Sequence, residues 1–97
     1  MTRNEMLLLK VMEECAEVAQ RVSKALCFGM SEVQPGQEFD NKTRIMAEFT
    51  DLVATMEMAG LHPRSLDEDA LRAKKVKVEK YVKYSESCGM VAEETQG

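Results

Sequence analysis

An apolar repeat with the period of an α-helix occupies the opening part of this 97-residue chain. Between Asn4 and Leu26, apolar side chains recur every three or four residues, at Leu8, Val11, Met12, Cys15, Val18, Ala19, Val22, Ala25 and Leu26. This spacing predicts one amphipathic helix of about six turns, and Phe28-Gly29 then ends it. A short chain that opens with so long a helix has room for only a few further elements.

Turn and capping signals predict a second helix. The segment from Ser31 to Asp40, with Pro35-Gly36 in its middle, has the composition of a loop. Asp40 or Asn41 can cap a helix that runs to about Ala59, with an inner face of Ile45, Met46, Phe49, Leu52, Val53 and Met56. A connecting loop of this length makes antiparallel packing of the two helices the expected arrangement.

A third helix is expected after Pro63. Ser65 and Glu68 form a capping box for a helix that continues to about Ser87 and ends at Gly89, with a thinner stripe of Leu71, Val78, Tyr81 and Val82. No segment alternates for long enough to predict a strand. The expected fold is therefore all-α, with three main helices of which the first two form an antiparallel pair. We expect one domain over residues 1–89 and a frayed or disordered tail over 90–97.

Composition excludes several classes of function. No apolar run approaches the roughly 18 to 20 residues of a membrane helix, so we expect a soluble, cytoplasmic protein. Cys15, Cys27 and Cys88 form no CxxC motif and the chain has one histidine, so ligands for a zinc site are lacking and reduced thiols are expected. Cys15 falls at the centre of the first stripe and is expected to be buried. The core of so short a chain is thin, which favours a homo-oligomer.

Charge is unevenly distributed along the chain. The net charge of −4 argues against a general nucleic-acid binder. Arg64 to Tyr84 nevertheless carries seven basic and four acidic residues, a balance of +3, which leaves −7 for the rest. This division suits a ligand of mixed charge, such as a phosphate chain accompanied by a metal cation.

Two matching pairs of acidic residues carry the strongest functional signal: Glu14 with Glu17, and Glu48 with Asp51. The three-residue spacing puts both carboxylates of a pair on one helix face. With roughly 100° of rotation per residue, Glu14 and Glu48 lie about −100°, and Glu17 and Asp51 about −160°, from the centres of their apolar stripes. Equal offsets on antiparallel helices put both pairs on the same edge, so we expect the four carboxylates to converge.

Converging carboxylates repel one another unless a cation compensates their charge. The expected cation is Mg²⁺, for which Mn²⁺ can substitute, because the predicted site offers oxygen donors and no thiol or imidazole. Such a cation polarises a phosphoryl oxygen and lowers the pKa of a bound water, and Glu14 or Glu17 would then accept the water's proton. The alternative, in a chain with 31% charged residues, is that each pair belongs to a solvated helix face.

The acidic residues stand in a motif. Glu13-Glu14-Cys15-Ala16-Glu17 followed by Glu48-Phe49-Thr50-Asp51 resembles the EExxE…ExxD signature of MazG-like all-α nucleoside triphosphate pyrophosphohydrolases. The resemblance covers roughly residues 5 to 90. It implies a Mg²⁺ ion bound by Glu14, Glu17, Glu48 and Asp51, with Glu13 in support, and cleavage of a nucleoside triphosphate to the monophosphate and pyrophosphate. It also implies dimers or tetramers in which helices of two subunits form a four-helix core.

Candidate substrate contacts come from the same resemblance and from helix geometry. The resemblance implies that Lys24 and lysines of the third helix contact phosphates. On that helix, Lys74 projects about −40° and Lys77 about −100° from the stripe centre at Val78, which makes them the best candidates. Tyr84 is a candidate for stacking on a base. The alternative for Lys74 is a side chain that passes the core to reach solvent.

Two departures from the family pattern bear on activity. Thirty residues separate Glu17 from Glu48, more than the family leads us to expect, and Cys27 stands where similar chains have arginine. The sequence thus predicts a Mg²⁺-dependent nucleotide pyrophosphohydrolase, with a phosphoribosyl-ATP pyrophosphohydrolase relative as a less supported variant. The main alternative is a non-catalytic helical module that binds a nucleotide or a partner protein. A third hypothesis is a helical assembly subunit whose acidic pairs serve only solubility.

Overall fold

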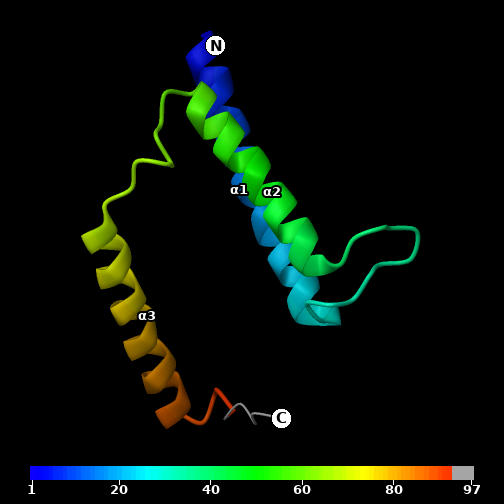
Figure 1. Cartoon of the computed structure of the whole chain (residues 1–97), viewed down its shortest axis with the longest axis vertical. Helices are drawn as coiled ribbons and strands as arrows, with labels where there is room; N and C mark the ends of the chain where they lie inside the picture. The colour runs from blue at the N-terminus through cyan, green and yellow to red at the C-terminus, as the bar shows by residue number, and fades with distance from the viewer. Residues whose placement is uncertain (93–97) are drawn as a thin grey trace. The chain divides into compact units, whose positions relative to one another are not determined.

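The computed structural model of the chain describes residues 1–92, and the chain divides into two compact units, Met1–Pro63 and Arg64–Gly97. The first unit is a hairpin of two helices, α1 (Arg3–Phe28) and α2 (Asn41–Met58), and the second contains α3 (Glu68–Ser87). Figure 1 shows α1 and α2 side by side, running in opposite directions. The described residues contain no strand. The all-α class, the three helices and the pairing of the first two are thus confirmed, whereas a single domain over 1–89 stays a prediction.

Both ends of α1 are closed by local hydrogen bonds. Thr2 Oγ1 accepts a hydrogen bond from the Glu5 N–H at 3.1 Å, and Glu5 Oε1 accepts one from the Thr2 N–H at 3.3 Å, which is a capping box. At the other end, Gly29 has a φ of 101°, a conformation that residues with a Cβ rarely adopt, and its N–H donates to the Ala25 carbonyl at 2.8 Å. These caps extend α1 slightly beyond the predicted span.

Asp40 is the N-cap of α2. Its Oδ1 accepts a hydrogen bond from the Thr43 N–H at 2.9 Å. Hydrogen bonding with the Thr43 side chain, and then with its backbone N–H, holds the pKa of Asp40 below its ordinary value. Of the two residues that could have capped this helix, Asp40 therefore has that role, and Asn41 has a different one.

Asn41 anchors the loop between α1 and α2. It is only 2% exposed, and its Nδ2 donates to the Gly29 carbonyl at 2.8 Å and to the Glu32 carboxylate at 2.9 Å. The loop is held a second time one turn later, where Arg44 Nη1 donates to Gln34 Oε1 at 2.9 Å. The loop predicted to be long is thus tied to the first two turns of α2, so it fixes how the hairpin closes.

The two helices of the hairpin meet along a seam whose positions are alternately four and three residues apart. The seam comprises Leu7, Val11, Glu14, Val18, Arg21 and Ala25 on α1, and Asn41, Ile45, Glu48, Leu52, Thr55 and Ala59 on α2 and its C-cap; all are buried or half-buried. This spacing is that of helices with knobs-into-holes packing. Several seam residues are polar or charged, and two of them, Glu14 and Glu48, are predicted site residues.

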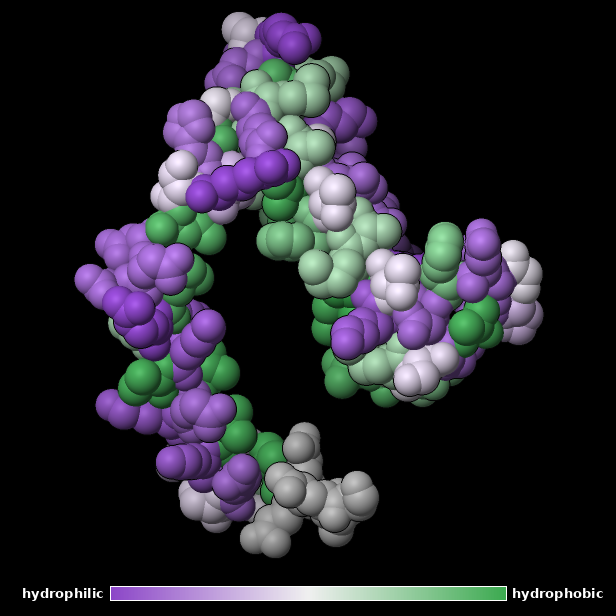
Figure 2. All heavy atoms as spheres, in the orientation of Figure 1, coloured by the Kyte–Doolittle hydropathy of each residue, from purple (hydrophilic) through white to green (hydrophobic). Residues whose placement is uncertain are grey.

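Part of each predicted inner face lies in the seam, namely Val11, Val18 and Ala25 on α1 and Ile45 and Leu52 on α2. The rest lies one position further along each helix and is largely open to solvent. We call these ten residues the open face: Leu8, Met12, Cys15, Ala19, Val22 and Leu26 on α1, which are exposed, and Met46, Phe49, Val53 and Met56 on α2, of which the last two are half-buried. The prediction that Cys15 is buried is therefore wrong. Each helix has two adjacent apolar rows, and the period alone does not decide which row faces its neighbour. Figure 2 shows green, hydrophobic residues on the visible surface of the hairpin.

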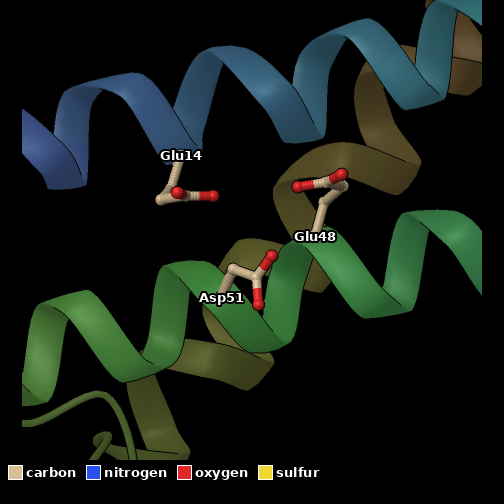
Figure 3. Close-up of side chains that lie close together, drawn as sticks. All are labelled: Glu14, Glu48 and Asp51. Atoms are coloured by element: carbon tan, nitrogen blue, oxygen red, sulfur yellow. The ribbon is translucent and has the colours of Figure 1, made fainter.

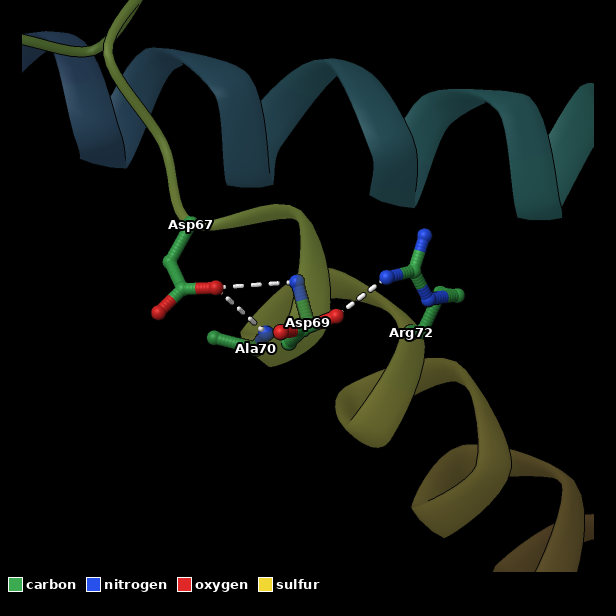
Figure 4. A network of polar contacts seen from close by, with 4 residues as sticks. All are labelled: Asp67, Asp69, Ala70 and Arg72. Atoms are coloured by element: carbon green, nitrogen blue, oxygen red, sulfur yellow. Dashed lines mark hydrogen bonds and ion pairs between the residues drawn. The ribbon is translucent and has the colours of Figure 1, made fainter.

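The second unit is built on α3, whose N-cap is Asp67. Asp67 Oδ1 accepts hydrogen bonds from the Asp69 N–H at 2.8 Å and the Ala70 N–H at 3.2 Å, and Arg72 pairs with the Asp69 carboxylate (Figure 4). The predicted capping box that starts at Ser65 is therefore wrong, because the nearer carboxylate satisfies the terminal N–H groups. No residue of α3 is buried, so its predicted apolar stripe is exposed.

The predicted end of α3 is confirmed. The helix ends at Ser87, and Gly89 follows with a φ of 75°. The Met90 N–H donates to the Ser85 carbonyl at 3.0 Å. The rest of the predicted tail, residues 93–97, lies outside the described residues. Within residues 1–92, no helix has both the length and the apolar character needed to cross a lipid bilayer.

Candidate functional site

Three of the four predicted acidic residues come together on the hairpin. Glu14, Glu48 and Asp51 each contribute one carboxylate oxygen to a set in which all oxygens lie within 4.8 Å of one another. In Figure 3, the Glu14 carboxylate from α1 points toward α2, and the Glu48 and Asp51 carboxylates from α2 point toward α1. We call these three residues the carboxylate group. Glu14 and Glu48 are half-buried and Asp51 is exposed, so the group is open to a ligand on one side.

The position of the carboxylate group follows from the seam. Glu14 and Glu48 occupy seam positions, so each helix directs one carboxylate at the other. Asp51 is three residues beyond Glu48, which places it about 60° around α2, on the side away from the open face. Antiparallel packing brings the middle of α1 to the middle of α2, so the two motifs meet although thirty residues separate Glu17 from Glu48.

The electrostatics of the group are those of crowded like charges. The pKa of Glu14 is raised above its ordinary value of 4.5, first by partial removal of its carboxylate from water and then by the negative charges of Asp51, Glu48, Glu17 and Glu13. A carboxylate in this setting gains more than an isolated one from a proton or a metal cation, because either relieves the repulsion. Glu14 is thus sensitive to what the group binds.

Glu17 and Glu13 take other positions. Glu17 is exposed and is not part of the set of oxygens within 4.8 Å, although its charge still acts on the pKa of Glu14. Glu13 Oε2 forms an ion pair with Lys10 Nζ at 3.0 Å, and both side chains are about half exposed. The structure therefore brings together three of the four implied metal ligands and leaves Glu17 at the edge, within electrostatic range.

Basic side chains flank the carboxylate group within the hairpin. Arg44 is held by Gln34 through the loop, one turn before Glu48. Lys24 is half-buried, with its Nζ 5.9 Å from the centre of the Phe28 ring, an arrangement of the cation–π type. Lys24 lies near the end of α1, nearly three turns beyond Glu14. The implied contact of Lys24 with phosphate stays a prediction.

Arg21 was not among the site residues predicted from the sequence. It occupies the seam seven residues after Glu14, and its Nη1 is shielded from solvent without a hydrogen-bond partner among the described residues. A guanidinium keeps its charge at all relevant pH values. The sequence indicates this position, because a spacing of seven residues from Glu14 keeps Arg21 on the same helix face. Arg21 therefore adds a permanent positive charge to the same seam as the carboxylate group.

The three predicted contacts on α3 belong to the second unit. Lys74, Lys77 and Tyr84 are all exposed, and Tyr84 is 71% exposed. Each is available to a ligand, and their participation in the site stays a prediction. Cys27, a departure from the family pattern that the motifs resemble, is exposed as well.

Comparison with known proteins assigns the chain to no family, because no family model, curated protein or solved structure matches it. The site must therefore be interpreted from its own residues. Three carboxylates in mutual reach, two of them half-buried, can hold a hard divalent cation through oxygen ligands and can exchange a proton with a water molecule. No histidine or cysteine joins the carboxylate group within the described residues, so its donor set is purely oxygen.

Proposed function

We propose that this protein is a Mg²⁺-dependent nucleotide pyrophosphohydrolase, which cleaves a nucleoside triphosphate or a related nucleotide to the monophosphate and pyrophosphate. The observation that carries the proposal is the meeting of Glu14 with Glu48 and Asp51 from the other helix. The resemblance of the two acidic motifs to those of MazG-like pyrophosphohydrolases gives the reaction class.

The chemistry of the donor set supports a hard cation. Carboxylate oxygens are the protein ligands that Mg²⁺ prefers, and Mn²⁺ accepts the same set. The raised pKa of Glu14 supports the same assignment, because the repulsion that raises it would be relieved by a bound cation. Glu48 and Asp51 are the proposed ligands from α2 and Glu14 is the one from α1. Glu17, whose charge acts on the pKa of Glu14, is the fourth proposed ligand.

The residues of the chain would then divide the reaction between them. Bound Mg²⁺ would supply charge neutralisation for the phosphates and a lowered pKa for a coordinated water. Glu14 or Glu17 would accept the proton of the attacking water while the new P–O bond forms. The bridging P–O bond at the attacked phosphorus breaks, and the phosphate group on the other side of that bond leaves with the electron pair.

The proposed substrate contacts are basic and aromatic side chains. Lys24 is the candidate within the hairpin, and Lys74 and Lys77 are the candidates on α3, each as a contact for phosphate oxygens. Tyr84 offers a ring on which a base could stack. These assignments leave the base, the sugar and the attacked phosphorus open, so the test must cover a range of nucleotides.

The test is pyrophosphate release from a panel of standard and modified nucleoside triphosphates, with Mg²⁺ and with a chelator. The wild-type protein is compared with Glu48→Gln and Asp51→Asn, and with Glu38→Gln as a matched control, since Glu38 is an exposed loop carboxylate outside the carboxylate group. We expect Mg²⁺-dependent release that both site variants abolish and the control keeps. Activity that survives Glu48→Gln and Asp51→Asn would remove these residues from the mechanism.

The same experiment separates the alternatives. Binding of a nucleotide that depends on Mg²⁺, without release of any pyrophosphate, would select the non-catalytic binding module. A protein that neither binds nucleotides nor changes its melting temperature with Mg²⁺ would select the assembly subunit whose acidic pairs serve solubility.

A further inference from the structure

Three basic side chains lie between the carboxylate group and the loop, on one side of the hairpin. With the seam position on each helix taken as zero, Arg21 lies at about −20° and Lys24 at about −80° around α1, and Arg44 at about −40° around α2. Equal offsets on antiparallel helices face the same side, which is also the side of Asp51, at about −60°. All three basic side chains are half-buried, so they lie against the hairpin.

The distances along the helix axes bring two of these side chains toward the same level. At about 1.5 Å per residue, Arg44 lies roughly 6 Å from Glu48 toward the loop. On α1, Arg21 lies roughly 10 Å from Glu14, also toward the loop. Side chains on a helix lean toward its N-terminus. Arg21 therefore leans back toward the carboxylate group and Arg44 leans toward the loop, so the two guanidinium groups approach the same level from opposite directions.

Two of the three basic side chains already have a contact at the loop end of the hairpin. Arg44 Nη1 donates a hydrogen bond to Gln34 Oε1 at 2.9 Å. Lys24 Nζ is 5.9 Å from the centre of the Phe28 ring, and Phe28 is one turn further from the carboxylate group than Lys24 is. Arg21 differs from both, because its Nη1 is shielded from solvent and has no hydrogen-bond partner among the described residues.

The unsatisfied nitrogen of Arg21 indicates an anionic ligand. A charged donor that is buried without an acceptor destabilises the fold, so a ligand that supplies the acceptor binds favourably. The charges that raise the pKa of Glu14 come from acidic neighbours, and within the described part of the chain Arg21 is not among the groups that act on it. A guanidinium offers two parallel N–H groups to a phosphate, which an ammonium group cannot do. Arg21 thus fits a phosphate group beside the carboxylate group.

We propose that Arg21 binds the terminal phosphate of a nucleoside triphosphate, and that Arg21 with Arg44 thereby selects substrates by the number of their phosphates. The phosphate chain would start at the carboxylate group and extend toward the loop. Arg21 starts roughly 10 Å from Glu14 along α1 and leans back toward it, which suits the far end of a chain and not a single phosphate at the carboxylates. This inference rests on the proposed function for the identity of the ligand, and it adds the direction in which the ligand lies.

The test is the affinity of the full chain for inorganic triphosphate, pyrophosphate and orthophosphate in the presence of Mg²⁺, measured by isothermal titration calorimetry. Arg21→Gln removes the guanidinium group. Arg3→Gln is the matched control, because Arg3 is an exposed arginine in the first turn of the same helix. We expect the wild type to bind triphosphate most tightly. Arg21→Gln should weaken triphosphate binding by roughly tenfold to a hundredfold and leave orthophosphate binding unchanged.

Two further variants separate recognition of the ligand from a structural role. Arg21→Lys keeps the charge and loses the planar fork, so it should restore only part of the triphosphate affinity. Arg44→Gln should lower the ratio of triphosphate to orthophosphate affinity by a smaller factor than Arg21→Gln does. A loss of folding would lower both affinities together, and circular dichroism detects it. Triphosphate that binds no more tightly than orthophosphate, or equal losses in Arg21→Gln and Arg3→Gln, would overturn the proposal.

Failure of the proposed function has a different result. A wild-type protein that binds triphosphate through Arg21 but releases pyrophosphate from no nucleotide would keep this phosphate contact and reject the hydrolase. Release of pyrophosphate that requires Glu48 and Asp51, at a KM that Arg21→Gln does not change, would keep the hydrolase and overturn the role of Arg21.

Discussion

Glu14 combines a position in the seam between α1 and α2 with a raised pKa. It is half-buried in a seam between two helices, and four other carboxylates act on its pKa. A hydrophobic residue at this position would pack better against α2, so the carboxylate weakens the metal-free hairpin. A residue that lowers the stability of the fold and is accessible to a ligand is a candidate for a functional role.

Removal of the Glu14 charge should change how stability depends on pH. Because the folded-state pKa of Glu14 is raised, its protonated form favours the folded state, and the metal-free protein loses stability as the pH rises above about 4.5 through the raised value. We expect Glu14→Gln to flatten this part of the curve of melting temperature against pH, measured with a chelator present. A wild-type slope that persists in Glu14→Gln would assign the effect to other groups.

Magnesium should act in the opposite sense to the proton at the same residue. Since a cation competes with protons for the carboxylates, the rise in melting temperature caused by Mg²⁺ should grow with pH across this range and shrink in Glu14→Gln.

If Glu14 is also the proton acceptor, Glu14→Gln should lower kcat by roughly 10² to 10⁴. Glu17→Gln, outside the set of close oxygens, should have the smaller effect on Mg²⁺ binding.

At the level of single residues, the sequence predicted Glu14, Glu48 and Asp51 as neighbours and missed Arg21 and Asn41. The matching spacing of the two motifs was enough for the first three, because helix geometry fixes angles well. Burial of Arg21 and Asn41 depends on which apolar row faces the seam, and that choice is made by tertiary packing. Glu17 has the same angular offset as Asp51 but does not join the set of close oxygens, so the angle alone was not sufficient to predict which carboxylates converge.

The elements of the fold are set largely by their ends. Thr2 with Glu5, Asp40 and Asp67 cap the three helices, and glycines with positive φ follow α1 and α3. Helix existence could be predicted from periodicity, since long amphipathic repeats are distinctive. The exact cap could not always be predicted, because neighbouring polar residues compete for the same terminal N–H groups, as Ser65 and Asp67 do.

The competition at α3 gives a direct prediction. Asp67→Ala should destabilise the first turn of α3 by about 1 kcal/mol, whereas Ser65→Ala should have almost no effect. Amide hydrogen exchange of residues in that turn measures the difference. Equal loss of protection in the two variants would show that Ser65 shares the capping role.

Loss of the Asn41 hydrogen bonds to the loop should lower the free energy of unfolding more than loss of a helix cap does. Asn41→Ala removes two hydrogen bonds and leaves the Gly29 carbonyl without its side-chain donor, which should cost about 2 to 3 kcal/mol in the free energy of unfolding. Urea unfolding measures this cost, with Asn4→Ala as the control because Asn4 is exposed on α1. If the two variants are equally stable, Asn41 does not hold the loop.

At the scale of the whole molecule, the hairpin combines a polar side and an apolar side. The carboxylate group lies toward one side and the open face toward the other. Met46 lies on the open face and is 55% exposed. We therefore expect Met46→Glu to keep the Mg²⁺ dependence of the melting temperature, as followed by circular dichroism, because the added charge lies on the other side of the hairpin from the carboxylate group.

The most direct test of the central claim is the location of a bound divalent cation. Addition of substoichiometric Mn²⁺ to the isotopically labelled protein broadens the NMR signals of nuclei close to the ion, and Mg²⁺ should reverse the effect by competition. We predict selective broadening around Glu14, Glu48 and Asp51 that Asp51→Asn weakens and Glu38→Gln leaves unchanged. Broadening that is absent, or spread evenly over the acidic surface, would contradict a shared ion between α1 and α2.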